Sequence, residues 1–180
     1  MQLASKEETE MKKDSIGYKV VLLGVLCAVC GLLLSLVNGI TEPVIAKASL
    51  ESELANLELL YPGADFTEVT DYDDPTGLVT GVYEAEGKGM VFKIHAVGYN
   101  SNGFTIMVSI DNDGKISGFQ ELEQAETSGF GARCFEDEYK NTITSLTVTD
   151  DVPLLSGATL TSTAIHNGIN AAKDIFNASK

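Results

Sequence analysis

A short stretch near the end of the chain carries side chains suited to holding a phosphate. It combines three hydroxyl groups with two very small residues, directly before apolar residues at helical spacing: Ser156, Gly157, Ala158, Thr159, Leu160 and Thr161. The unpaired N–H groups and the dipole at a helix N-terminus favour an anion, and small residues leave the backbone open to it. On composition alone, the stretch predicts either an anion site or a hydroxyl-rich cap for the following helix.

The same stretch resembles the signature Ser/Thr-Gly-Ala-Thr/Ser-x-Thr/Ser, at which a family of membrane flavoproteins carries FMN on the final hydroxyl, here Thr161. A second stretch resembles the Glu-Thr-Pro-Gly-Leu-Gly loop of that family and keeps Glu126, Thr127, Gly129 and Gly131, with Ser128 for Pro and Phe130 for Leu. Gly98-Tyr99 and Gly103 are similar to its Gly-Tyr-rich turn. The family is the FMN-binding domain shared by the G subunit of the Rnf ferredoxin:NAD oxidoreductase complex and the C subunit of the sodium-pumping NADH:quinone reductase.

The resemblance implies FMN joined to Thr161 through a phosphoester. It implies that the Ser156–Leu160 stretch shapes access and holds the phosphate, and that Glu126, Thr127, Gly129 and Phe130 contact the flavin. Attachment requires an alcohol that a modifying enzyme can reach, so we expect an accessible Thr161 hydroxyl. A separate flavin transferase is implied as the source of the FMN unit, taken from FAD, and we expect no residue of this chain to catalyse that transfer.

As a function, the resemblance implies an electron-carrying subunit of an Rnf-type complex. Its partners would be the other membrane and peripheral subunits, and electron flow between ferredoxin and NAD would be coupled to sodium or proton translocation. The alternatives are the C subunit of the sodium-pumping quinone reductase, a stand-alone membrane-anchored extracellular flavoprotein, and a non-redox binding module. The short chain, without long insertions, favours the Rnf subunit.

Other chemistries find little support in the sequence. Neither His95 nor His166 has a cysteine or second histidine at ligand spacing, so no zinc site or other metal site is predicted. Nucleophile-elbow and dinucleotide-binding motifs are both missing from the sequence. Cys27 and Cys30 lie within an apolar run and are interpreted as packing residues, which leaves Cys134 as the only thiol beyond it.

The run Val20–Ile40 is uncharged for 21 residues, about 31 Å as a helix, and predicts a transmembrane span. Its length favours a retained helix over a cleaved signal peptide. Four lysines precede the run and only Lys47 follows closely, which predicts a single-pass protein of the inner or plasma membrane with its N-terminus in the cytoplasm. We expect a cytoplasmic tail at 1–14, a transmembrane helix at 15–40, a connecting helix at 41–62 that restarts at Thr41–Pro43, and an extracytoplasmic FMN-binding domain at 63–180.

The net charge of −14 lies wholly beyond the apolar run, because residues 41–180 carry 22 acidic and 8 basic residues. Such an acidic surface argues against nucleic-acid binding. Alternation predicts strands at 77–86, 90–97, 104–110 and 115–122, with a short strand at 146–148. Helical spacing predicts helices at 135–146 and 163–178. The expected fold is α+β, an antiparallel sheet with packed helices behind one transmembrane helix.

Overall fold

The computed structural model describes residues 16–180, so the predicted tail at 1–14 lies outside the described residues. The chain divides into two compact units, Met1–Leu50 and Glu51–Lys180, and we call the second the C-terminal unit. The predicted site residues all belong to the C-terminal unit.

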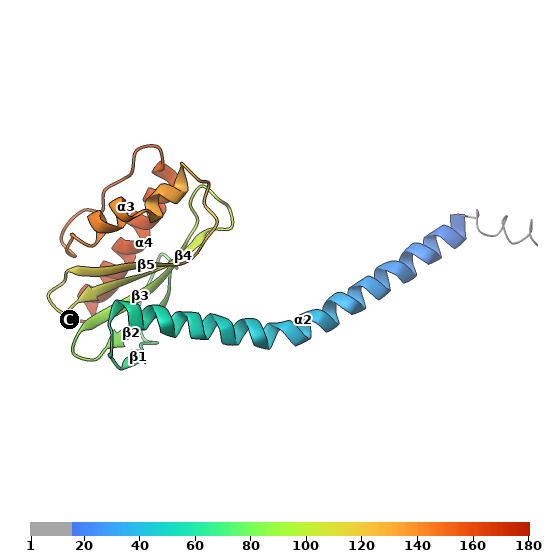
Figure 1. Ribbon diagram of the computed structural model, residues 1–180, viewed down its shortest axis with the longest axis horizontal. Coiled ribbons are helices and arrows are strands. Elements are labelled where there is room, and N and C mark those ends of the chain that lie inside the picture. The colour runs from blue at the N-terminus through green and yellow to red at the C-terminus, as the bar shows by residue number, and fades with distance from the viewer. Residues whose placement is uncertain (1–15) are drawn as a thin grey trace, which may run out of the picture. The chain divides into compact units, whose positions relative to one another are not determined.

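Helix α2 spans Ile16–Leu60 and contributes to both units (Figure 1). Its first part, Ile16–Gly39, is long and apolar enough to cross a membrane, and none of its residues is buried within the described protein. The expected restart at Thr41–Pro43 is not seen, because the helix continues through these residues. The Thr41 hydroxyl donates to the Val37 carbonyl at 3.0 Å, one turn back, as a threonine inside a helix does.

The C-terminal unit is built on a five-stranded antiparallel sheet in the order β1-β2-β3-β4-β5. Its strands are β1 Phe66–Glu68, β2 Val79–Ala85, β3 Gly89–Ala96, β4 Phe104–Asp111 and β5 Ile116–Gln124. The sheet confirms the predicted fold class and the four long strands. Strand β1 was not predicted, since three residues are too few to show alternation. The predicted strand at 146–148 is reduced to one bridge between Lys115 and Thr147.

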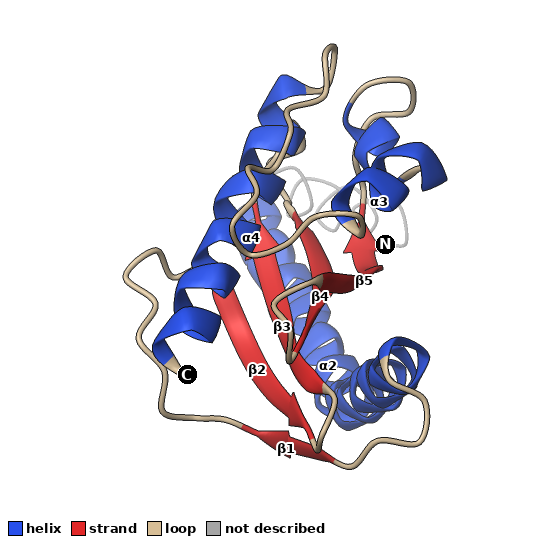
Figure 2. Ribbon diagram, turned by 90° about the vertical axis from the view of Figure 1, so that its left-hand side faces the viewer, coloured by secondary structure: helices blue, strands red, loops and turns tan. Residues whose placement is uncertain are grey.

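Helices cover both faces of the sheet, α4 on one and the last turns of α2 on the other (Figure 2). Successive side chains of a strand point to opposite faces, so Phe92 and Ile94 pack under α4 whereas Val91 packs with Leu57 of α2. On the face covered by α2, Lys93 Nζ donates to Glu53 Oε2 of that helix at 2.6 Å. The Tyr83 hydroxyl donates to the other carboxylate oxygen of Glu53. The larger core lies between α4 and one face of strands β2 to β5.

Three elements follow the sheet: the 3₁₀ helix η1 at Gly131–Phe135, α3 at Asp137–Ile143 and α4 at Thr159–Ala178. The predicted helix at 135–146 is therefore shorter, and η1, which ends at Phe135, was not predicted. Helix α4 begins four residues earlier than predicted. The Ser162 hydroxyl explains the earlier start, because it donates to the Ala158 carbonyl and accepts from the Leu155 N–H, both at 3.0 Å.

Gly168 allows α4 to approach β3 closely, since a Cβ at this position would lie 2.5 Å from Cγ2 of the buried Ile94. We predict that Gly168→Val lowers the free energy of unfolding by about 2 kcal/mol, through overpacking of this contact. Thermal unfolding of the purified chain measures the change. Asn167→Val, which places the same side chain on the exposed neighbour, is the control and should change stability by less than about 0.5 kcal/mol. Equal effects of the two substitutions would contradict the packing argument.

Candidate functional site

The Thr161 hydroxyl lies against the carboxylate of Glu126. Thr161 is the third residue of α4, four residues before Ile165 on the same inward face, and only 1% of it is exposed. Its Oγ1 donates to Glu126 Oε2 at 3.2 Å and accepts from the Tyr99 N–H at 3.3 Å. The hydroxyl is therefore less accessible than the sequence predicts, because it is held by groups from two other segments.

Glu126 follows strand β5 and is 8% exposed. Its two carboxylate oxygens accept from the Asn100 N–H at 3.3 and 3.4 Å, and its own N–H donates to Gln124 Oε1 at 2.8 Å. The Asn100 side chain donates to the Ala125 carbonyl at 2.6 Å, which fixes the turn after β3 against the end of β5. Among the described residues, no lysine, arginine or histidine forms an ion pair with Glu126.

Two glycines enclose this pair of side chains. A Cβ on Gly98 would overlap the Glu126 carboxylate and lie 2.9 Å from Thr161 Oγ1. A Cβ on Gly131 would also overlap that carboxylate and would lie 2.6 Å from the same hydroxyl oxygen. Any larger residue at either position would displace one of the two groups, so the site depends on both glycines.

The N-terminus of α4 has the features of an anion site. Its N-cap residue is Ala158, and in the described part of the chain no side chain caps the helix. The alternative of a hydroxyl-rich cap is thus not seen, and the N–H groups of the first turn are available to an anion. Arg133, the only arginine of the sequence, donates to the Ser156 carbonyl at 3.0 Å and so brings a positive charge to the loop before the helix.

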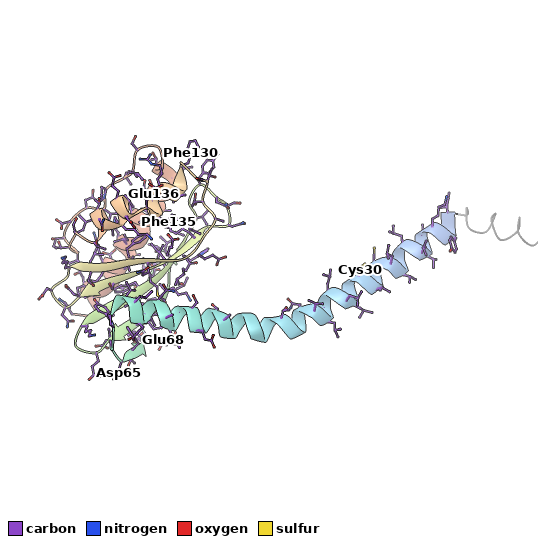
Figure 3. All side chains as sticks on the ribbon, viewed as in Figure 1. Cys30, Asp65, Glu68, Phe130, Phe135 and Glu136 are labelled. Carbon is purple, nitrogen blue, oxygen red and sulfur yellow. The ribbon has the colours of Figure 1, made fainter. Side chains whose placement is uncertain are left out.

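A hollow of about 250 Å³ opens at the first turn of α4, lined by Tyr99, Phe130, Gly131, Gly157, Ala158, Thr159, Leu160 and Thr161. Three of these side chains are large, apolar and exposed: Tyr99 by 64%, Phe130 by 60% and Leu160 by 62%. In Figure 3, Phe130 lies at the outer edge of the C-terminal unit. Exposed apolar side chains gathered around a hollow are typical of a surface that receives a ligand or a partner.

The predicted site residues differ in how they take part. Six line the hollow: Phe130, Gly157, Ala158, Thr159, Leu160 and Thr161. Glu126 lies behind the Thr161 hydroxyl. Thr127, Gly129 and Ser156 do not line the hollow. The Thr127 carbonyl accepts from the N–H groups of Phe130 and Ala132, Gly129 turns the chain at φ +78°, and the Ser156 carbonyl accepts from Arg133.

Arg133 and Asn100 were missing from the predicted set. Arg133 had a usable signal, because it is the only arginine and stands close after the predicted loop. Asn100 contributes its backbone N–H to Glu126, and a backbone group leaves no mark on the sequence. Gly98 and Tyr99 were noted only as a turn, whereas the structure places both beside Thr161.

In a comparison with protein families, residues 98–174 match the FMN-binding domain, a range that contains the residues of the hollow. The chain is also similar to whole proteins. It is 30% identical over 179 residues to the G subunit of the ion-translocating oxidoreductase complex of Methanosarcina acetivorans, an alignment covering 88% of this chain and 93% of that protein. The chain therefore belongs to the family of G subunits of ion-translocating oxidoreductase complexes.

Two further relatives carry more specific names. One is the G subunit of the proton-translocating ferredoxin:NAD(+) oxidoreductase complex of Clostridium ljungdahlii, 26% identical over 83% of this chain and 85% of that protein. The other is the G subunit of the Na(+)-translocating ferredoxin:NAD(+) oxidoreductase complex of Acetobacterium woodii, 27% identical over 92% of this chain and 96% of that protein. The two names differ in the translocated ion.

Cys134 of η1 lies in the core close to this site. Burial, with a smaller contribution from the Glu126 charge, raises the pKa of its thiol to about 12. Because the thiolate is the reactive form, we predict that Cys134 reacts with a maleimide at pH 8 at least about 100-fold more slowly than an exposed cysteine, and faster as the pH rises towards 12.

Labelling rates followed by mass spectrometry measure this in a chain that lacks Cys27 and Cys30. Ser128→Cys, made together with Cys134→Ala, provides the exposed control. Urea should abolish the protection of Cys134. Rapid labelling of the folded chain at pH 8 would contradict the assigned burial.

Proposed function

We propose that this chain is the electron-carrying subunit of an Rnf-type ferredoxin:NAD oxidoreductase complex and that it bears FMN in phosphoester linkage to Thr161. The observation that carries the proposal is the position of Thr161, which lines a hollow at the first turn of α4. It is an alcohol beside an uncapped helix N-terminus, inside a segment that matches the FMN-binding domain. The proposed type of complex is supported by the names of the relatives, which are G subunits of ferredoxin:NAD(+) oxidoreductase complexes.

The residues present fit the phosphate end of FMN. The free N–H groups of the first turn of α4 and the Thr159 hydroxyl donate hydrogen bonds of the kind a phosphate accepts. Arg133 holds the Ser156–Gly157 segment and supplies a positive charge in a unit that is otherwise strongly acidic. Gly157 and Ala158 keep side chains out of the path to the helix N-terminus.

The exposed apolar residues fit the flavin ring. Tyr99, Phe130 and Leu160 border the hollow on three segments and present surface that water solvates poorly. Phe130, in the place of the leucine typical of the family, offers an aromatic face for stacking. FMN supplies the redox chemistry when bound, and the protein supplies its position and surroundings.

Attachment requires the site to open. Because Thr161 is 1% exposed, its oxygen reaches the active site of a flavin transferase only after a local movement, and the exposed loop 127–130 is the neighbouring segment proposed to move. We propose that this loop, which contains Gly129, provides that movement. The transferase is a partner during maturation, and the other subunits of the complex are the partners during turnover.

For the location, we propose a single-pass membrane subunit with its N-terminus in the cytoplasm and the C-terminal unit outside it. The apolar segment Ile16–Gly39 supports the span. The lysines that precede this segment support the orientation through the positive-inside rule. An FMN domain on the outer side would exchange electrons with the partner subunits there.

We predict that Thr161→Ala abolishes covalent flavin whereas Thr161→Ser retains it, because the linkage needs an alcohol at this position. Each chain is coexpressed with a flavin transferase and examined on a denaturing gel for fluorescence under ultraviolet light and by intact mass. Thr163→Ala, which removes a hydroxyl outside the hollow, is the control and should stay fluorescent. If the wild-type chain gains no mass corresponding to FMN minus water, the proposed linkage is wrong.

The orientation predicts where an impermeant thiol reagent acts on intact protoplasts or spheroplasts. In a chain without native cysteines, Asn177→Cys near the exposed end of α4 should be labelled without permeabilisation. Ser5→Cys, placed before the lysines, should be labelled only after permeabilisation. The reverse pattern would place the C-terminal unit in the cytoplasm.

A further inference from the structure

Glu126 is a buried carboxylate whose place the proposed flavin site does not yet explain. Burying a carboxylate costs free energy unless charged or polar groups compensate. Here the compensation comes from the Asn100 N–H and the Thr161 hydroxyl, and from no ion pair among residues 16–180. A phosphate bound beside Thr161 would gain nothing from this carboxylate, because two neighbouring anions repel each other. The group that the Glu126 carboxylate is placed to act on is therefore the proton of the Thr161 hydroxyl.

We infer that Glu126 is the general base for the attachment of flavin to Thr161, a role that rests on the proposed linkage. As Thr161 Oγ1 forms its bond to the FMN phosphorus of FAD, the hydroxyl O–H bond breaks and its proton passes to Glu126 Oε2. The bond between that phosphorus and the bridging oxygen breaks, and AMP leaves with the electron pair. Atoms and charge balance with FAD as the only co-reactant, presented by the transferase.

The geometry suits this single proton transfer. The hydrogen bond from Thr161 Oγ1 to Glu126 Oε2 already exists at 3.2 Å, so the base touches the reacting atom. The Tyr99 N–H donates to the same hydroxyl oxygen, which leaves the threonine proton directed at the carboxylate. The backbone at Gly98 and Gly131 lies so close to the Glu126 carboxylate that this side chain has little room to rotate away from Thr161. Under this inference the chain supplies one residue to its own modification, whereas the sequence alone led us to expect none.

A structural role is the competing explanation. Glu126 also links the end of β5 to the turn at Asn100, so its removal could disturb the site without any loss of base catalysis. Glu126→Gln keeps the size of the side chain and an oxygen that accepts hydrogen bonds, but it does not take up a proton at neutral pH. Glu123→Gln removes the same charge from an exposed residue of β5 and is the matched control.

The experiment measures the rate of flavin attachment to the full chain in detergent, prepared without flavin and then mixed with excess flavin transferase and FAD. Intact mass and gel fluorescence at successive times give the rate, and thermal unfolding checks that each variant is folded. General-base catalysis contributes about 10²- to 10⁴-fold. We expect Glu126→Gln to be at least about 100-fold slower than the wild type, and Glu123→Gln to be within about threefold of it.

A second variant keeps the test decisive if the glutamine chain is poorly folded. Glu126→Ala leaves space behind the hydroxyl, and sodium formate should restore part of the rate there while sodium chloride at the same ionic strength should not. Attachment to Glu126→Gln at the rate of Glu123→Gln, or no difference between formate and chloride, would overturn the base role. A wild-type chain that takes up no flavin at Thr161 would instead overturn the proposed function.

Discussion

The burial of one face of α4 against the sheet is the constraint on which the site depends. Ile165, Ile169 and Phe176 are almost fully buried, and each contributes about 1.5–3 kcal/mol as an apolar side chain removed from water. Thr161 lies on the same face, one turn before Ile165. The packing that orients the helix therefore also drives the threonine inward, against Glu126 and between Gly98 and Gly131. The buried hydroxyl is stabilised there because two other segments supply its hydrogen bonds, through the Tyr99 N–H and the Glu126 carboxylate.

The sequence predicted the sheet well because the signal is local. Apolar residues recur at alternate positions of β3 and β4, and Phe92 and Ile94 of β3 and Ile106 and Val108 of β4 belong to the core that includes α4. The start of α4 was missed because Thr159 and Thr161 are weak helix formers in isolation and tertiary packing decides the matter. Had the apolar stripe been extended back by one turn, Thr161 would have fallen on it.

The candidate site was predicted in its residues and not in its geometry. The motif Ser156–Thr161 identified the hydroxyl, and Glu126 was named as a flavin contact, yet nothing in the sequence indicated that the two would form a hydrogen bond. That contact joins positions 35 residues apart. It depends on the antiparallel register of the sheet and on a backbone N–H at Asn100, and neither is encoded in a short motif.

The charge distribution places a further demand on the site. Residues 41–180 carry 22 acidic and 8 basic residues. Their net negative charge repels an anionic cofactor at long range and so disfavours its binding. At the proposed site, the dipole of α4, a helix of 20 residues, and Arg133 beside its first turn would offset this repulsion locally. Because salt screens long-range repulsion more than close contacts, the local interactions dominate near the helix N-terminus.

The burial of the Cys134 thiol protects it from oxidation and from reaction with other thiols. Sulfenic acids, mixed disulfides and glutathione adducts all form through an accessible thiolate, which this residue does not present. Beyond Leu50 the sequence offers no second cysteine for an intramolecular bridge. Residues 51–180 therefore hold no pair of cysteines that could form a disulfide with each other, and the one thiol they contain is protected by burial.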